Sequence, residues 1–405
     1  MVAKRPVVAC LTPFQECVVP SRFLLFICLF LIGLGVSVQG IAQGGERQAL
    51  DGQWYGVGWD ATNEYLSAIV DIVFDVVGGS GSADVYVPDL GVFHESLPVT
   101  IVGDAITIGD PAVFGLTGTI TGQTIEGEGW QSGILIATWY LEKDVGAPTN
   151  PGPAPGPPCD DLPPLLCTGG VEYCAEVIPF EPDEGPGYWD YPIPGETAVD
   201  QWYSYLRRDA VMLIKYASAK VECKTTAWDY GNLAPLGLGD MSEADGSTPG
   251  TNIGSLRHPP GTHVRGYDID AAYYQLFSPD NLLRTVGDSY IGTEDQNHLV
   301  GDPYALDVWR TALFIAYLSE HPDLRVIGVD GQVGLILEPA LGQLVTLGWI
   351  DENLNESIPL AYEVTNQGYG WFLYHDGHMH VSMIGIIFGD GFESGGTGAW
   401  SAVVQ

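Results

Sequence analysis

The sequence predicts a multidomain protein, with an all-β domain over residues 47–145 followed by an α+β domain over residues 159–388. Apolar residues in the first region recur at every second position, which is the pattern of strands with one buried face. Those in the second region recur at helical spacing between short apolar runs. A segment rich in proline and glycine, residues 146–158, separates the two regions. A chain of 405 residues is long enough for both to bury a core.

The first region predicts an up-and-down β-barrel or a β-sandwich. Between Val70 and Val76 alternate positions are apolar. Gly103-Asp104 and Gly122-Gln123 lie between apolar runs, as the turns of hairpins do. Five further runs are expected to be strands: Asp84–Val87, Leu97–Val102, Ala105–Ile108, Leu116–Ile120 and Ile134–Leu141.

Two short segments of this region carry a resemblance. Asp51–Gly56 reads DGQWYG and Gly127–Gln131 reads GEGWQ. Their tryptophan and glycine spacing resembles that of the small lipocalin-like β domains attached to secreted bacterial enzymes. The aromatic side chains are expected to be core residues rather than the lining of a ligand site.

The segment Gly146–Pro158 reads GAPTNPGPAPGPP and predicts a stiff, extended linker. Beyond it we expect helices over residues 199–220, 307–319 and 333–347, the last interrupted near Pro339. Short strands and long loops between them predict a small central sheet. Residues 389–405 form a glycine-rich tail, similar to the short tails of assorted secreted bacterial proteins, whose default interpretation is a loosely docked end.

The charge balance excludes some partners. The formal net charge is −36, from 51 acidic and 15 basic side chains. Such a chain repels nucleic acids and anionic lipid surfaces, so functions that require phosphate recognition are not expected. A single aspartate or glutamate also carries little information in so acidic a sequence.

The N-terminus predicts export. Arg22 precedes an apolar run of 16 residues, Phe23–Val38, and the small residues Gly40 and Ala42 follow. This run is short for a membrane span and typical of a signal peptide. We expect residues 1–42 to be removed, leaving a periplasmic or extracellular bacterial protein with no stable membrane insertion. A translation start further downstream, or retention as an anchor, are the alternatives.

The cysteines agree with export. Cys10, Cys17 and Cys28 would leave with the signal peptide. The four that remain predict two disulfides with three possible connectivities, because their spacing lacks the Cys-x-x-Cys pair of a structural zinc site. They are Cys159, Cys167, Cys174 and Cys223.

Histidines gather in two distant segments. Five of the eight histidines lie in or beside residues 261–270 and 374–381. In the second segment a strand is expected, which would place His378 and His380 on one face, roughly 6–7 Å apart. In the first, Gly266 permits a sharp bend. Beyond it, alternation would place Asp268 and Asp270 on one strand face.

These side chains suit a single zinc ion. Two imidazoles and one carboxylate leave the fourth tetrahedral position open, and zinc there can activate water to attack an amide carbonyl. The second carboxylate of the Asp268/Asp270 pair would orient a ligand imidazole by a hydrogen bond. Competing hydrolase motifs are absent from the sequence, since His94-Glu95 starts no His-Glu-x-x-His motif and no Gly-x-Ser-x-Gly occurs.

The combined pattern resembles a known superfamily. A His-x(6)-Asp segment followed by His-x-His is similar to the lysostaphin, D-Ala-D-Ala peptidase and hedgehog zinc peptidases, and most similar to the penicillin-insensitive murein endopeptidases. The matching stretches are Gly239–Ser242 (GDMS), Thr262–Asp270 (THVRGYDID) and His375–Val381 (HDGHMHV). The resemblance spans roughly residues 200–385. Thr262 replaces the usual serine, a Trp-His pocket motif is missing and a β domain is added.

The resemblance implies roles for individual residues. His263, Asp270 and His380 would hold Zn²⁺. His378 would be the unligated imidazole that takes a proton from water or steadies the oxyanion, with His375 as a further active-site imidazole. Asp240 would support a ligand from behind, or be an ordinary loop carboxylate. The remaining positions are expected outside the metal site: His94, His298 and His321 as surface or core residues, His258 as a loop residue, and Arg265 as an exposed loop residue or a contact to a substrate carboxylate.

The sequence therefore predicts an exported zinc metallopeptidase that hydrolyses peptidoglycan cross-link peptides, in the manner of a murein endopeptidase, or similar short peptides. A peptidase for protein substrates is a further interpretation. An alternative from another class is a secreted binding or adhesion protein with a structural or vestigial zinc site.

Overall fold

The computed structural model describes residues 50–384 except 88–91, 145, 147–149, 153–158, 198–200 and 290–296. The predicted signal peptide, most of the predicted linker and the predicted tail lie outside the described residues. No described helix combines the length and the apolar character that crossing a membrane requires.

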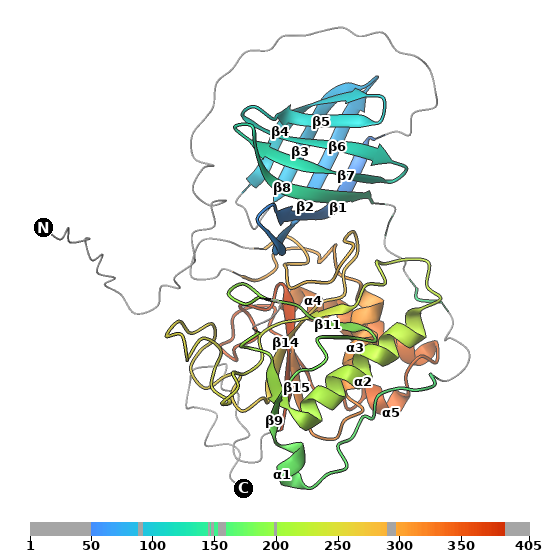
Figure 1. Ribbon diagram of the computed structural model, residues 1–405. Coiled ribbons are helices and arrows are strands. Elements are labelled where there is room, and N and C mark those ends of the chain that lie inside the picture. Colours follow the sequence, from blue (N-terminus) through green and yellow to red (C-terminus); the bar gives the residue numbers. More distant parts are fainter. Residues whose placement is uncertain are drawn as a thin grey trace, which may run out of the picture. The chain divides into compact units, whose positions relative to one another are not determined.

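The N-terminal part is a closed antiparallel barrel in which each strand pairs with the next and β8 pairs with β1 (Figure 1). This confirms the barrel among the two predicted all-β architectures. Its hairpins turn at Gly103-Asp104 and Gly122-Gln123, as expected. The strands are β1 (Gly52–Asp60), β2 (Asn63–Val77), β3 (Ser80–Val87), β4 (Val92–Val102), β5 (Ala105–Asp110), β6 (Phe114–Thr121), β7 (Thr124–Gln131) and β8 (Ile134–Lys143).

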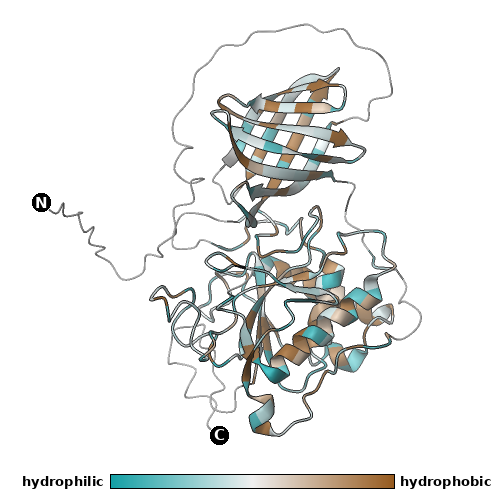
Figure 2. Ribbon diagram, in the orientation of Figure 1, coloured by the Kyte–Doolittle hydropathy of each residue, from teal (hydrophilic) through white to brown (hydrophobic). Residues whose placement is uncertain are grey.

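Side chains fill the barrel. Hydrophobic and hydrophilic residues alternate along its strands (Figure 2), and the inward set includes Ile72 and Phe74, both buried. Trp54 and Trp139 belong to the same core. A Cβ atom at Gly118 would lie 2.8 Å from the ring of Trp139, so a glycine is needed beside this large ring. The tryptophans are therefore core residues, as the sequence predicts.

The C-terminal part contains a mixed seven-stranded sheet in the order β10-β11-β13-β14-β17-β15-β16, and a two-stranded sheet of β9 and β12. Its central strands are β14 (Asp268–Ala272) and β17 (His378–Met383). The other strands are β9 (Val177–Pro179), β10 (Glu184–Gly185), β11 (Tyr188–Asp190), β12 (Tyr205–Arg207), β13 (Leu236–Leu238), β15 (Leu324–Gly328) and β16 (Leu360–Ala361). The helices are α1 (Val171–Cys174), α2 (Arg208–Thr225), α3 (Val308–Leu318), α4 (Gly331–Thr346) and α5 (Glu352–Asn355).

The helices follow the expected positions with two corrections. The helix predicted over residues 199–220 spans Arg208–Thr225 instead. It begins later because Tyr205–Arg207 pairs with β9 as a strand, and it continues beyond the predicted end. The interruption expected near Pro339 is wrong, since α4 continues through it. Pro339 and Leu335 both lie on the exposed side of α4. The carbonyl of Leu335, which loses its helical partner at Pro339, can therefore bond to water.

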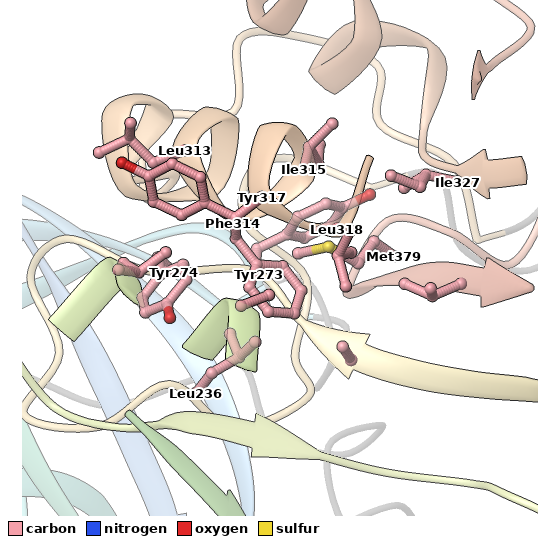
Figure 3. Close-up of a cluster of buried hydrophobic side chains, with 14 of the residues drawn as sticks. Leu236, Tyr273, Tyr274, Leu313, Phe314, Ile315, Tyr317, Leu318, Ile327 and Met379 are labelled. Atoms are coloured by element: carbon pink, nitrogen blue, oxygen red, sulfur yellow. The ribbon is translucent and has the colours of Figure 1, made fainter. Parts of the chain in front are cut away.

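The core of this part joins α3 to the central strands. Phe314 and Leu318 of α3 lie beside Tyr273 and Met379, as Figure 3 shows. The side chain of Asp307 caps α3 by accepting a hydrogen bond from the backbone of Arg310 at 3.1 Å. This packing fixes the inner face of β14 and β17, which leaves their other face for polar side chains.

Two disulfides form, as predicted from the cysteine count: Cys159–Cys223 and Cys167–Cys174. They close segments with sequence separations of 64 and 7 residues.

Removing the Cys159–Cys223 disulfide should destabilise the protein more than removing Cys167–Cys174. The entropy gained by the unfolded chain grows with the closed segment, which gives about 4 kcal/mol for the longer loop and about 2.5 kcal/mol for the shorter one. Urea unfolding of the two paired cysteine-to-serine variants measures the difference. An equal loss of unfolding free energy would contradict this expectation.

Candidate metal centre

Two central strands carry most of the site. β14 and β17 run antiparallel, with Asp270 opposite His380 and Asp268 opposite Ser382. The residues between them in sequence, Ile269 and Met379 among them, are buried in the core. Alternation therefore turns the aspartates and histidines to the opposite face of the sheet, as the sequence predicts.

His263 lies in a tight turn that precedes β14. Gly266 has a φ of +66°, and a Cβ atom there would lie 2.4 Å from the backbone nitrogen of Arg207. His263 itself has a φ of +50°, an uncommon conformation for a residue with a side chain. Its backbone N–H donates to Asp268 Oδ2 at 3.1 Å. The turn is thus tied to the strand whose carboxylates it faces.

Three imidazoles approach one carboxylate oxygen. Asp270 Oδ1 lies 3.3 Å from His263 Nε2 and 3.1 Å from His380 Nδ1. His378 Nε2 lies 3.6 Å from the same oxygen. The side chains of His263, Asp270 and His380 are nearly inaccessible, at 1%, 3% and 5% exposure, whereas that of His378 is 20% exposed. The structure thus brings together residues that are 110 positions apart.

His258 approaches the second carboxylate oxygen of Asp270. Its Nε2 lies 2.9 Å from Asp240 Oδ2 and 3.4 Å from Asp270 Oδ2, and its ring stacks on that of His263 at 4.0 Å. Ligand atoms of His258, His263 and Asp270 all lie within 4.8 Å of one another, so these three can hold a metal ion.

From the sequence, His258 is expected to be a loop residue outside the metal site, and the structure corrects the second part of this expectation. His258 does lie in a loop, but its imidazole reaches the site. The nearness to His263 and the intervening Pro259-Pro260, which favour a change of chain direction, were the available signals.

Polar contacts on the outer side indicate which ring nitrogens face Asp270. His263 Nδ1 lies 3.0 Å from the backbone oxygen of Asp240, so Nδ1 carries the proton and Nε2 keeps its lone pair. His380 has the opposite ring orientation. Its Nε2 lies 3.5 Å from Asp268 Oδ1, so its Nδ1 faces Asp270. Asp240 thus contacts His263 through its backbone oxygen, and Asp268 contacts His380 through its carboxylate. Their role in supporting metal ligands stays a prediction.

The distances around Asp270 Oδ1 are compatible with a bound metal ion, and zinc gives the reference values. Two ligand atoms about 2.0–2.1 Å from zinc at a tetrahedral angle are about 3.3–3.4 Å apart. The separations of His263 Nε2 and His380 Nδ1 from Asp270 Oδ1, 3.3 Å and 3.1 Å, are close to this value. His263 Nε2 is also buried without a hydrogen bond to the described residues. A buried lone pair of this kind calls for a cation or a donor.

The charges of the site are set for a cation. Burial by itself would raise the pKa of Asp270, but in the metal-free protein the positive charge that His378, His263 and His258 carry when protonated outweighs burial and holds this pKa well below its usual value. Burial would also raise the pKa of Asp268. The hydrogen bond and the charge of His380 outweigh this effect and lower the pKa below its usual value. The carboxylates therefore remain ionised in the interior, where they attract positive charge.

His375 lies next to the group. Its ring is 5.5 Å from that of His378 and 6.4 Å from that of His380. Its backbone oxygen accepts a hydrogen bond from the hydroxyl of Tyr273 at 2.8 Å. Burial, followed by the charges of His378 and His380, lowers the pKa of His375 to about 3. This imidazole is neutral at neutral pH.

The stability of the metal-free protein should therefore fall as the pH decreases from about 7 to 5. The pKa of His375 is about 3 in the folded state against 6.5 for the free side chain, so between these values only the unfolded chain binds the proton. Stability is complete above the unfolded pKa and is lost below it, by about 2 kcal/mol at pH 5. Urea unfolding of the chelated protein at both pH values measures this loss. The variant His375→Gln should show a shallower dependence, and an unchanged slope would contradict the assignment.

The other histidines lie outside this group. His94 is exposed on the barrel, 3.4 Å from Asp84. His321 is buried and accepts the backbone N–H of Asp323 at 3.1 Å. The ring of His298 lies 4.3 Å from that of Phe372. Arg265 is exposed.

Comparison of the chain with protein-family models gives no match, and comparison with curated proteins gives none.

Proposed function

We propose that this protein is an exported zinc metallopeptidase that hydrolyses amide bonds in the cross-link peptides of peptidoglycan. One observation carries the proposal: His263 Nε2 and His380 Nδ1 approach Asp270 Oδ1 at 3.3 Å and 3.1 Å, with the more exposed His378 3.6 Å from the same oxygen. The order of these residues in the sequence also resembles that of the murein endopeptidases.

The proposed ligands are His263, Asp270 and His380. When bound by them, zinc supplies a Lewis acid that polarises an amide carbonyl and acidifies water. His258 is a less suitable ligand than His380, because its Nε2 already lies 2.9 Å from Asp240 Oδ2 and approaches the other oxygen of Asp270. We propose that His258 and Asp240 hold His263 in place, because the ring of His258 stacks on that of His263.

His378 is the proposed general base. Burial lowers its pKa, an effect that the charge of Asp270 opposes, so the imidazole is available in its neutral form. Its Nε2 accepts a proton from the attacking water as the bond from oxygen to the carbonyl carbon forms. The same nitrogen returns that proton to the leaving amine as the carbon–nitrogen bond breaks. Its 20% exposure gives a peptide access that the buried His263 and His380 do not have.

Export is supported by the two disulfides, which persist in oxidising environments outside the cytosol. The peptidoglycan substrate is supported by the motif resemblance described above.

Digestion of purified cell walls tests the function. The proposal expects soluble peptides to be released, release to stop when zinc is chelated, and release to return when zinc is added. Protein that holds zinc but cleaves neither cell walls nor peptides would contradict a peptidase and favour a secreted binding protein with a structural zinc site. Cleavage of casein with cell walls left intact would contradict the substrate and favour a peptidase for protein chains.

A further inference from the structure

A buried carboxyl group outside the metal site organises the loop that leads into it. Glu363 is 3% exposed and follows β16. Its Oε1 accepts the backbone N–H groups of Gln367 and Tyr369, at 2.7 Å and 3.3 Å, and its Oε2 accepts that of Trp371 at 2.8 Å. Three donors on one carboxyl group determine the path of residues 364–371, which contain no helix or strand of their own.

The start of this loop is pinned by close backbone approach. The backbone N–H of Val329 donates to the carbonyl of Ala361 at 3.0 Å, next to the pairing of β15 with β16. A Cβ atom at Gly331 would lie 2.3 Å from the carbonyl oxygen of Glu363. Glu363 is therefore fixed against the first residue of α4, and its side chain acts from a rigid base.

The end of the loop places an indole beside the histidines. A Cβ atom at Gly328 would lie 1.9 Å from Trp371 Cζ3. The indole can therefore pack against β15 only because residue 328 has no side chain. From there the ring lies 5.5 Å from that of His375 and 6.2 Å from that of His380. Trp371 is only partly buried, and its ring lies beside His375 and the proposed ligand His380.

We infer that Glu363 is a positioning residue, whose carboxyl group folds residues 364–371 so that Trp371 forms an apolar wall against which the peptide substrate packs. This inference rests on the proposed peptidase function. Glu363 touches neither the proposed ligands nor the reacting atoms and acts through the indole. Its loss should weaken substrate binding without releasing zinc.

A double-mutant cycle tests this role. In Glu363→Gln, an amide nitrogen replaces one acceptor oxygen and faces a backbone N–H group. We expect Glu363→Gln and Trp371→Ala each to lower kcat/KM for a short cross-link peptide about tenfold, mainly through KM. The double variant should lie within about twofold of Trp371→Ala alone, because both changes remove the same wall. Zinc content should stay at the wild-type level, and the exposed Glu356→Gln, with the same charge change, should behave as wild type.

Independent effects that multiply in the double variant, or wild-type kinetics for Glu363→Gln, would overturn the inference. Gly328→Ala is a second route, because its methyl group displaces the indole while Glu363 is intact. Gly328→Ala should have the same KM as Trp371→Ala. A wild-type KM would contradict the proposal that the indole of Trp371 contacts the substrate.

Amide hydrogen exchange separates this inference from the proposed function. In Glu363→Gln the amides of Gln367, Tyr369 and Trp371 should exchange about tenfold faster than in the wild type, with those of β17 unchanged. This readout needs no activity. An inactive wild type with the expected exchange would overturn the peptidase and with it the substrate wall, whereas unchanged exchange in an active enzyme would overturn only the role of Glu363.

Discussion

Replacing Asp270 by asparagine should abolish both zinc binding and peptide hydrolysis. Asp270 Oδ1 is the atom that His263, His380 and His378 all approach, within 3.6 Å. Asparagine keeps the shape but removes the negative charge that attracts the cation in a buried site. We expect zinc affinity and kcat/KM to fall by about 10³-fold or more, equivalent to about 4 kcal/mol. Zinc titration and hydrolysis of a cross-link peptide measure the two effects.

The matched control is Asp245→Asn, which removes the same charge from an exposed loop position. It should keep wild-type zinc affinity and activity. Asp268→Asn is expected to be intermediate, with zinc affinity lowered about 10–100-fold, because Asp268 orients His380 without being a proposed ligand. A fully active, zinc-loaded Asp270→Asn variant would show that the metal lies elsewhere.

Replacing His378 by alanine should separate zinc binding from catalysis. Because His378 is proposed as the base and not as a ligand, zinc content should be unchanged. The loss of general base catalysis should lower kcat by about 10²–10⁴-fold, with a much smaller change in KM. Metal analysis and steady-state kinetics on the same preparation measure both.

His94→Ala provides a control, since His94 is an exposed histidine of the barrel. It should leave both quantities unchanged. If His378→Ala hydrolyses peptides at the wild-type rate, the base is another residue. If it loses zinc together with activity, His378 is a ligand and the assignment of the three ligands is wrong.

Local periodicity predicted the parts of the fold that depend on near neighbours. Alternation in Val70–Val76 predicted a barrel strand, and alternation around His378 and His380 predicted β17. The bend at Gly266 was predicted because few other residues tolerate a positive φ. These features depend on the backbone and on side-chain burial within one element.

Features that depend on distant partners were not predictable in the same way. The pairing of Cys159 with Cys223 depends on the folded chain, so the sequence left three connectivities open. The late start of α2 depends on the pairing of β12 with β9. The place of His258 in the site depends on its stacking on His263 and its contact with Asp240. No periodic pattern encodes such contacts.

The position of the metal is the most direct test of this account. A crystal of the protein grown with zinc, measured at the zinc absorption edge, locates the ion by its anomalous signal. We predict one peak at about 2.0–2.2 Å from His263 Nε2, Asp270 Oδ1 and His380 Nδ1, with His378 outside bonding distance. A peak bound by His258 in place of His380, or no peak near Asp270, would contradict it.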